Sequence, residues 1–103
     1  VMYFRAERVA AINRNDWLRL IPDLIVEVLS PSTEDYDRRT KRRTYEQLAV
    51  GHYWIVDVGR RTVAENVLQP TGRFTERVVG PDGPFRPVIF PDLEIDLTRI
   101  FAG

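Results

Sequence analysis

Two strongly apolar runs, separated by a charged segment of helical length, constrain the fold of this chain most. "DLIVEVLS" covers residues 23–30 and "HYWIVDV" covers residues 52–58. The charged segment predicts a helix over about 34–49, and Ser32 with Asp35 gives it a capping-box pattern. A strand, a helix and a strand in this order predict a crossover that pairs the two strands in parallel.

The rest of the chain predicts antiparallel additions to this pair. Gly51 is the expected stop of the helix. The other predicted elements are a short strand in "VMYFRA", a polar connection over 6–21, a hairpin of "RRTVAENVLQ" and "GRFTERVVG", and an extended tail ending in a helical turn from Asp96 to Phe101. We therefore expect the α/β class, with a mixed sheet.

Length and composition limit the kind of protein. The 103 residues, without internal repeats or linkers, suit one small domain over 1–103. The absence of cysteine excludes disulfides and thiol nucleophiles, and a single histidine, His52, excludes a multi-histidine metal site. No segment reads as a membrane span or a signal peptide, so we expect a cytoplasmic protein without a membrane partner. The balance of 15 basic and 15 acidic residues gives no global attraction to nucleic acid.

Glu27 is the unusual residue of the first apolar run. In "LIVEV" the period of two places Leu24 and Val26 on one face of the strand, and Ile25 and Glu27 on the other. A lone buried carboxylate costs several kcal/mol or takes up a proton. Glu27 therefore needs a cation from elsewhere in the chain, a bound metal, or open water.

Lys41 is the candidate cation. Of the 15 basic residues it is the only lysine, and the others are arginine. In the predicted helix, Asp37, Lys41, Tyr45 and Leu48 fall on one stripe. Tyr45 and Leu48 are expected to anchor the helix on the sheet, which brings the Lys41 ammonium within reach of Glu27.

Two interpretations of this pair remain open from the residues alone. In the first, Glu27 and Lys41 form a partly buried ion pair without a chemical role, or Lys41 extends to water. In the second, they are half of a hydrolytic site, in which the carboxylate holds a divalent cation and the amine orients the attacking water.

The residues from Pro22 to Asp57 carry a family resemblance. "PDLIVEVLSPST", the helix "DRRTKRRTYEQLAVGHYWIVD" and the hairpin after it resemble the Uma-type putative restriction endonuclease family, a bacterial branch of the PD-(D/E)XK nuclease superfamily. The resemblance implies a restriction-endonuclease-like fold and a phosphodiesterase site that uses Mg²⁺ or Mn²⁺, with DNA as the partner. It implies that Glu27 is the metal ligand, and that Lys41 replaces the usual lysine two residues after the glutamate, where this chain has Leu29.

One family feature is missing from the sequence. The family's first-motif aspartate opens a strand reading like "DVAFVRAER", whereas this chain begins "VMYFRAER". We therefore expect a truncated version of the domain, without that aspartate. Asp23 is a poor replacement, because it lies about 13 Å along the strand from Glu27, at about 3.3 Å per residue.

Substrate contacts and partners follow from the same segment. Arg38, Arg42 and Tyr45 are the candidate substrate-binding residues, although acidic neighbours make a solvated mixed-charge face the competing interpretation. A partial domain exposes apolar surface, so a second copy of the chain is a further candidate partner. The predicted function is a metal-dependent DNA endonuclease. The alternative is a catalytically inactive nuclease-fold remnant that acts as a binding or oligomerisation module.

Overall fold

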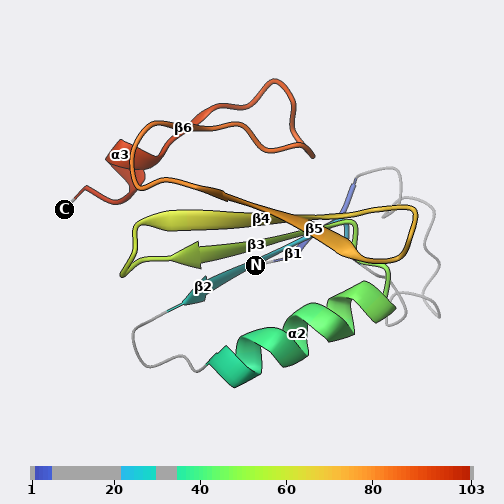
Figure 1. Cartoon of the computed structure of the whole chain (residues 1–103). Coiled ribbons are helices and arrows are strands. Elements are labelled where there is room, and N and C mark those ends of the chain that lie inside the picture. The colour runs from blue at the N-terminus through green and yellow to red at the C-terminus, as the bar shows by residue number, and fades with distance from the viewer. Residues whose placement is uncertain (1, 6–21, 30–34, 103) are drawn as a thin grey trace.

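A mixed five-stranded sheet forms the centre of the molecule. The computed structural model describes residues 2–5, 22–29 and 35–102. The strands, in their spatial order, are β1 (Met2–Tyr3), β2 (Leu24–Leu29), β3 (His52–Asp57), β4 (Thr62–Leu68) and β5 (Phe74–Val79). β2 and β3 are parallel, and the other neighbours are antiparallel (Figure 1). The predicted α/β class, crossover and hairpin are therefore confirmed, while the predicted connection over 6–21 lies outside the described residues.

Helix α2 (Asp35–Gln47) covers one face of the sheet (Figure 1). It ends earlier than predicted, because Ala49 and not Gly51 takes the left-handed conformation, with φ 58°. The Val50 amide donates to the Tyr45 carbonyl, and the Ala49 amide donates to the Glu46 carbonyl. These two bonds are the Schellman pattern of a helix end. The predicted cap at Ser32 lies outside the described residues.

The tail folds back over the opposite face of the sheet. It contains β6 (Pro84–Phe85), β7 (Ile95–Asp96) and α3 (Leu97–Ile100), and β6 pairs with β7. The Asp96 side chain caps α3 by accepting from the Thr98 amide. The predicted helical turn is thus confirmed, and the tail supplies the second outer layer (Figure 1).

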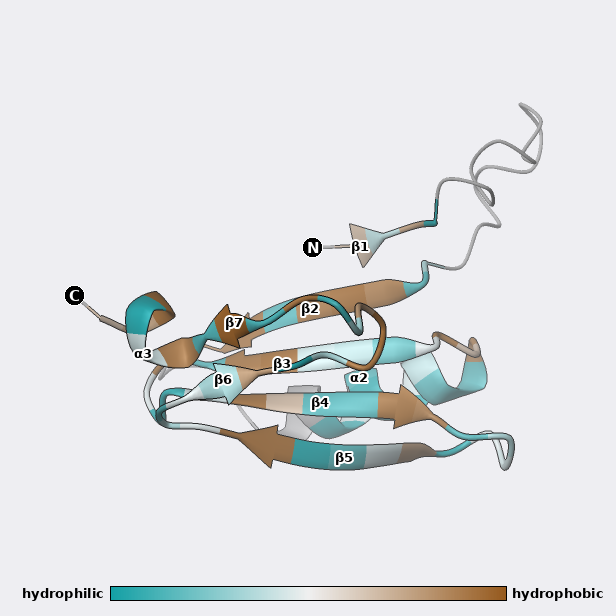
Figure 2. Cartoon of the chain, turned by 90° about the horizontal axis from the view of Figure 1, so that it is seen from above, coloured by the Kyte–Doolittle hydropathy of each residue, from teal (hydrophilic) through white to brown (hydrophobic). Residues whose placement is uncertain are grey.

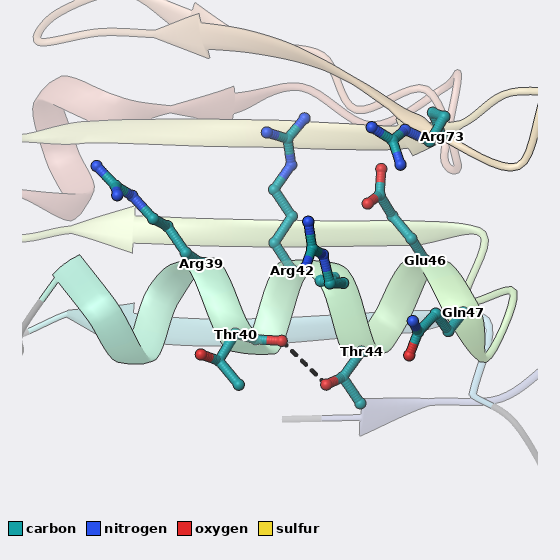
Figure 3. A pocket seen from close by; sticks show the side chains of 8 residues that line it. Arg39, Thr40, Arg42, Thr44, Glu46, Gln47 and Arg73 are labelled. Atoms are coloured by element: carbon teal, nitrogen blue, oxygen red, sulfur yellow. Dashed lines mark hydrogen bonds between the residues drawn. The ribbon is translucent and has the colours of Figure 1, made fainter.

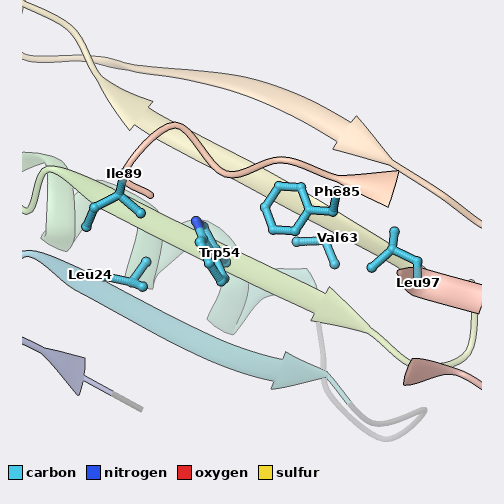
Figure 4. Packing of buried hydrophobic residues seen from close by; sticks show 6 residues of the cluster. All are labelled: Leu24, Trp54, Val63, Phe85, Ile89 and Leu97. Carbon is cyan, nitrogen blue, oxygen red and sulfur yellow. The ribbon is translucent and has the colours of Figure 1, made fainter. Parts of the chain in front are cut away.

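Alternating residues of the strands pack into two separate cores, one on each face of the sheet. The core beneath the tail contains Leu24, Trp54, Val63, Phe85, Ile89 and Leu97 (Figure 4). The core beneath α2 contains Ile25, Val50, Tyr53, Ile55, Ala64 and Phe74. The period of two predicted for the first apolar run is confirmed, and it places Glu27 on the α2 side. In Figure 2, β2 is largely brown, whereas β4 and β5 carry teal polar positions in mid-strand.

No helix in the described ranges is long and apolar enough to cross a membrane.

Candidate active site

Glu27 lies at the centre of the candidate site and has partners from two positions of α2. Its Oε1 accepts a hydrogen bond from the Tyr45 hydroxyl at 3.0 Å, and its Oε2 lies 3.6 Å from the Lys41 ammonium. The exposed fractions of the Glu27 and Lys41 side chains are 28% and 40%. The predicted approach of Lys41 to Glu27 is therefore observed, at a position that water can reach.

The Tyr45 ring fixes one side of this arrangement. It packs edge-on against Tyr53, with ring centroids 4.9 Å apart, and it borders the core beneath α2. Tyr53 itself is buried. A side chain with only two rotatable bonds, held by a buried ring, presents its hydroxyl to Glu27 at little entropic cost. The prediction that Tyr45 anchors the helix is confirmed.

The prediction that Leu48 is a second anchor of the helix on the sheet was wrong. Its exposed fraction is 48%. The helix instead contacts β5 through Arg42, which donates to the Phe74 carbonyl at 3.3 Å, and through Glu46, which accepts from the Phe74 amide at 2.7 Å. These two contacts fix which side of the helix faces the sheet. With that side inward, Leu48 lies outside the core.

The arginines proposed for substrate binding differ in their surroundings. Arg42 is half-buried, and its guanidinium is already bound to the Phe74 carbonyl. This contact identifies Arg42 first as a residue that joins α2 to β5. Arg38 belongs to α2, but its side chain lies outside the described residues.

The comparisons with known proteins agree with this architecture. The family model of Uma2, described as "Putative restriction endonuclease", matches residues 1–98. The chain belongs to the Uma2 family. No curated protein matches it. Among solved structures, a putative nuclease of DUF820 from Anabaena variabilis ATCC 29413 is similar, with a TM-score of 0.64 and 20% identity. That likeness, which shows the fold, covers 81% of this chain and 45% of the other, so the chain spans less than half of the solved protein.

The donor set of this Uma2 chain fits a divalent cation at Glu27 only in part. Mg²⁺ is commonly held by one or two carboxylates, with waters and substrate phosphates completing its shell. Glu27 supplies one carboxylate, and the residues described contain no group of three or more acidic or histidine side chains that could hold a metal. Asp23 accepts from the Arg5 amide, and Asp57, at the end of β3 on the same face as Glu27, accepts from the Arg60 amide. Glu27 by itself therefore does not complete the coordination shell of a metal ion.

A second strand carboxylate, Glu65, escaped the sequence interpretation. It lies on β4 under the tail with an exposed fraction of 1%. Its two oxygens accept from the Arg77 guanidinium at 2.6 Å and from the Val88 amide at 2.7 Å. The sequence contained a signal for this burial, because Glu65 shares a strand face with Val63 and Val67, just as Glu27 shares a face with apolar residues of its own strand. Its partners give it a structural task, which is to hold the tail on the sheet.

Proposed function

We propose that this chain carries the reactive strand and helix of a metal-dependent DNA endonuclease of the PD-(D/E)XK type. The observation that supports this function is the distance of 3.6 Å between the Lys41 ammonium and the Glu27 carboxylate at a water-accessible position. Membership of the Uma2 family, whose description is "Putative restriction endonuclease", suggests the reaction class, hydrolysis of a phosphodiester bond.

Glu27 has the role of metal ligand in this proposal. A bound Mg²⁺ or Mn²⁺ supplies a Lewis acid that polarises the phosphoryl oxygen and activates water. Tyr45 and Lys41 each contact one oxygen of Glu27, so the carboxylate keeps a fixed orientation. A carboxylate held in this way loses little entropy when it takes its ligand, as in other metal sites whose ligands have hydrogen-bonded supports.

Lys41 has the role of positioning the attacking water and stabilising charge. Its ammonium is a compact point charge that donates in three directions, which suits contacts with a water or a phosphate oxygen near Glu27. The developing negative charge on the phosphate is stabilised by a fixed cation in a partly desolvated position.

A second function, a catalytically inactive module that binds or oligomerises, also has a supporting observation. Within the described ranges Glu27 belongs to no group of three or more acidic or histidine side chains that could hold a metal. In that case the hydrogen bond of Glu27 with Tyr45 and its ion pair with Lys41 are structural, and they give α2 its position on β2.

A plasmid-nicking assay with Mg²⁺ or Mn²⁺ separates the two functions. The enzyme is expected to nick supercoiled plasmid, and Glu27→Gln and Lys41→Gln are each expected to lower the rate about a hundredfold or more. The matched control is the ion pair of Arg86 with Glu94 on the tail, 2.9 Å apart and exposed. Arg86→Gln and Glu94→Gln make the same charge changes and are expected to leave the rate unchanged.

Two results would count against this proposal, the first against the activity and the second against the site. If the purified chain does not nick the plasmid with either metal, the inactive module is the better description. If it nicks, but Glu27→Gln nicks at the same rate, the reactive centre lies elsewhere.

A further inference from the structure

A hollow lined by arginines lies between α2 and the turn that joins β4 to β5. Its volume is about 510 Å³, and its charged lining is Arg39, Arg42, Arg43, Arg73 and Glu46. Figure 3 shows Arg39 and Arg42 extending from α2 toward the sheet side, while Arg73 enters from the turn. A second hollow of about 330 Å³ shares Arg43, Glu46 and Arg73 with the first. The two therefore form one groove, which we call the arginine groove.

The arginine groove lies on a different flank of α2 from the candidate active site. Positions two residues apart in a helix are about 160° apart around its axis. Arg39 and Arg43 are each two positions from Lys41, and they share a flank with each other because they are four positions apart. Lys41 and Tyr45 therefore reach β2, whereas Arg42, Glu46 and the groove face β5.

Two of the charged lining residues have a structural task. Arg42 donates to the Phe74 carbonyl, and Glu46 accepts from the Phe74 amide. These bonds fix the wall of the groove against the start of β5. They also satisfy the carboxylate of Glu46, the acidic group among the described residues of the lining, through a donor that does not leave the site.

The other three arginines of the lining form no ion pair with a carboxylate of the described residues. Arg39, Arg43 and Arg73 are exposed. Among the residues that the structure describes, no carboxylate lies within ion-pair distance of them, although this chain forms ion pairs at Arg60, Arg61, Arg77 and Arg86. Three guanidinium groups around one hollow attract an anion, and their planar forks match the oxygens of a phosphate.

We propose that the arginine groove binds the phosphate backbone of duplex DNA at a distance from the bond that is cleaved. The identity of the ligand rests on the proposed nuclease function. The groove and the Glu27–Lys41 pair lie on different flanks of one helix, and a helix with its side chains is about 10 Å across. That width corresponds to about three base-pair steps of 3.4 Å. Arg39, Arg43 and Arg73 are therefore binding residues for neighbouring phosphates, separate from the reacting one.

The test is the affinity of the chain for a fluorescently labelled duplex of about 20 base pairs, measured by anisotropy in EDTA over a series of salt concentrations. The test variant is Arg39→Gln with Arg43→Gln. The matched control is Arg60→Gln with Arg99→Gln, which changes the net charge equally at two exposed arginines far from the groove along the chain. The test variant is expected to bind about tenfold or more weakly at low salt. Its slope of log K against log salt is expected to fall by about 2, since each lost phosphate contact removes about 0.9.

The inference is overturned if the wild-type chain does not bind the duplex, or if the test and control variants lose affinity equally. The nicking rate is measured beside the DNA affinity for the same proteins and for Glu27→Gln, because the two readouts keep the two proposals apart. If the chain binds through the groove but does not nick plasmid, the proposed binding site is supported and the proposed nuclease function is contradicted. If the chain nicks plasmid but the test variant binds as tightly as the wild type, the nuclease function is supported and the proposed binding site is contradicted.

Discussion

The Tyr45 hydroxyl donates to Glu27 Oε1 at 3.0 Å, across the interface between α2 and β2. This bond joins a residue of the helical stripe to the carboxylate that interrupts an apolar strand. Its donor is held by the buried ring of Tyr53, so the bond positions Glu27 as well as satisfying it.

Tyr45→Phe removes this bond and keeps the ring. We expect the free energy of unfolding to fall by about 1–2 kcal/mol, because the lost bond involves a charged acceptor. If Glu27 holds a metal, the Mn²⁺ concentration needed for half-maximal nicking is expected to rise about tenfold, since the ligand loses its support. Urea unfolding and a metal titration of the nicking rate measure the two effects. Tyr3→Phe is the control, and an equal response of the two variants would contradict the assignment.

Ala49→Gly is expected to stabilise the chain by about 1 kcal/mol. Ala49 ends α2 with φ 58°, a conformation that costs a residue with a Cβ about 1–2 kcal/mol and costs glycine little. Gly51→Ala is the matched exchange in the opposite direction, where an added Cβ would meet the Asp23 carbonyl at an ordinary 3.8 Å. It is expected to change the stability less. Thermal midpoints of the two variants check this, and a destabilised Ala49→Gly would refute the helix end described here.

Glu65→Gln is expected to destabilise the fold by about 2 kcal/mol. The substitution removes the charge from a fully buried group that binds the Arg77 guanidinium and the Val88 amide. Glu76→Gln, one residue before Arg77 on β5 and exposed, is expected to be neutral within about 0.5 kcal/mol. Urea unfolding compares the two. Equal effects would show that the contact of Glu65 with the tail contributes nothing specific.

His52 makes stability depend on pH below about 6.5, the ordinary pKa of histidine. Burial lowers the pKa of His52 from 6.5, against the opposing influence of the Glu65 carboxylate. The unfolded chain therefore takes up a proton at a higher pH than the folded chain, so stability is fully present above 6.5 and is lost as the pH falls below it. Thermal midpoints across this range are expected to fall on acidification, and to fall less in His52→Gln. Identical profiles would exclude His52 as the cause.

The crossover could be predicted from sequence because its signals are local. The two apolar runs have strand length, the helix follows the first strand directly, and the helix must pack back on the sheet. The same logic placed Lys41 near Glu27. The exposure of Leu48 could not be predicted in this way, because the rotation of α2 depends on the contact of Arg42 and Glu46 with Phe74, about thirty residues along the chain.

The burial of Glu65 shows the second limit. Its alternation with apolar residues marked it as a group in need of partners, but one of those partners is a backbone amide at Val88. Every residue except proline carries such an amide, so the residue type at position 88 does not indicate that it is the partner of Glu65. Only the folding of the tail over the sheet, which depends on the packing of residues such as Phe85 against Trp54, brings that donor into place.

The contact of α2 with Phe74 also limits how the sheet can grow. β5 is an outer strand, and outer strands offer free backbone groups that can template the addition of a strand from another molecule. At Phe74 both the amide and the carbonyl are already occupied by charged side chains of the helix. An incoming strand could therefore pair only beyond this residue, or would have to displace Arg42 and Glu46. The helix thus protects one end of the edge against polymerisation while it forms a wall of the groove beside it.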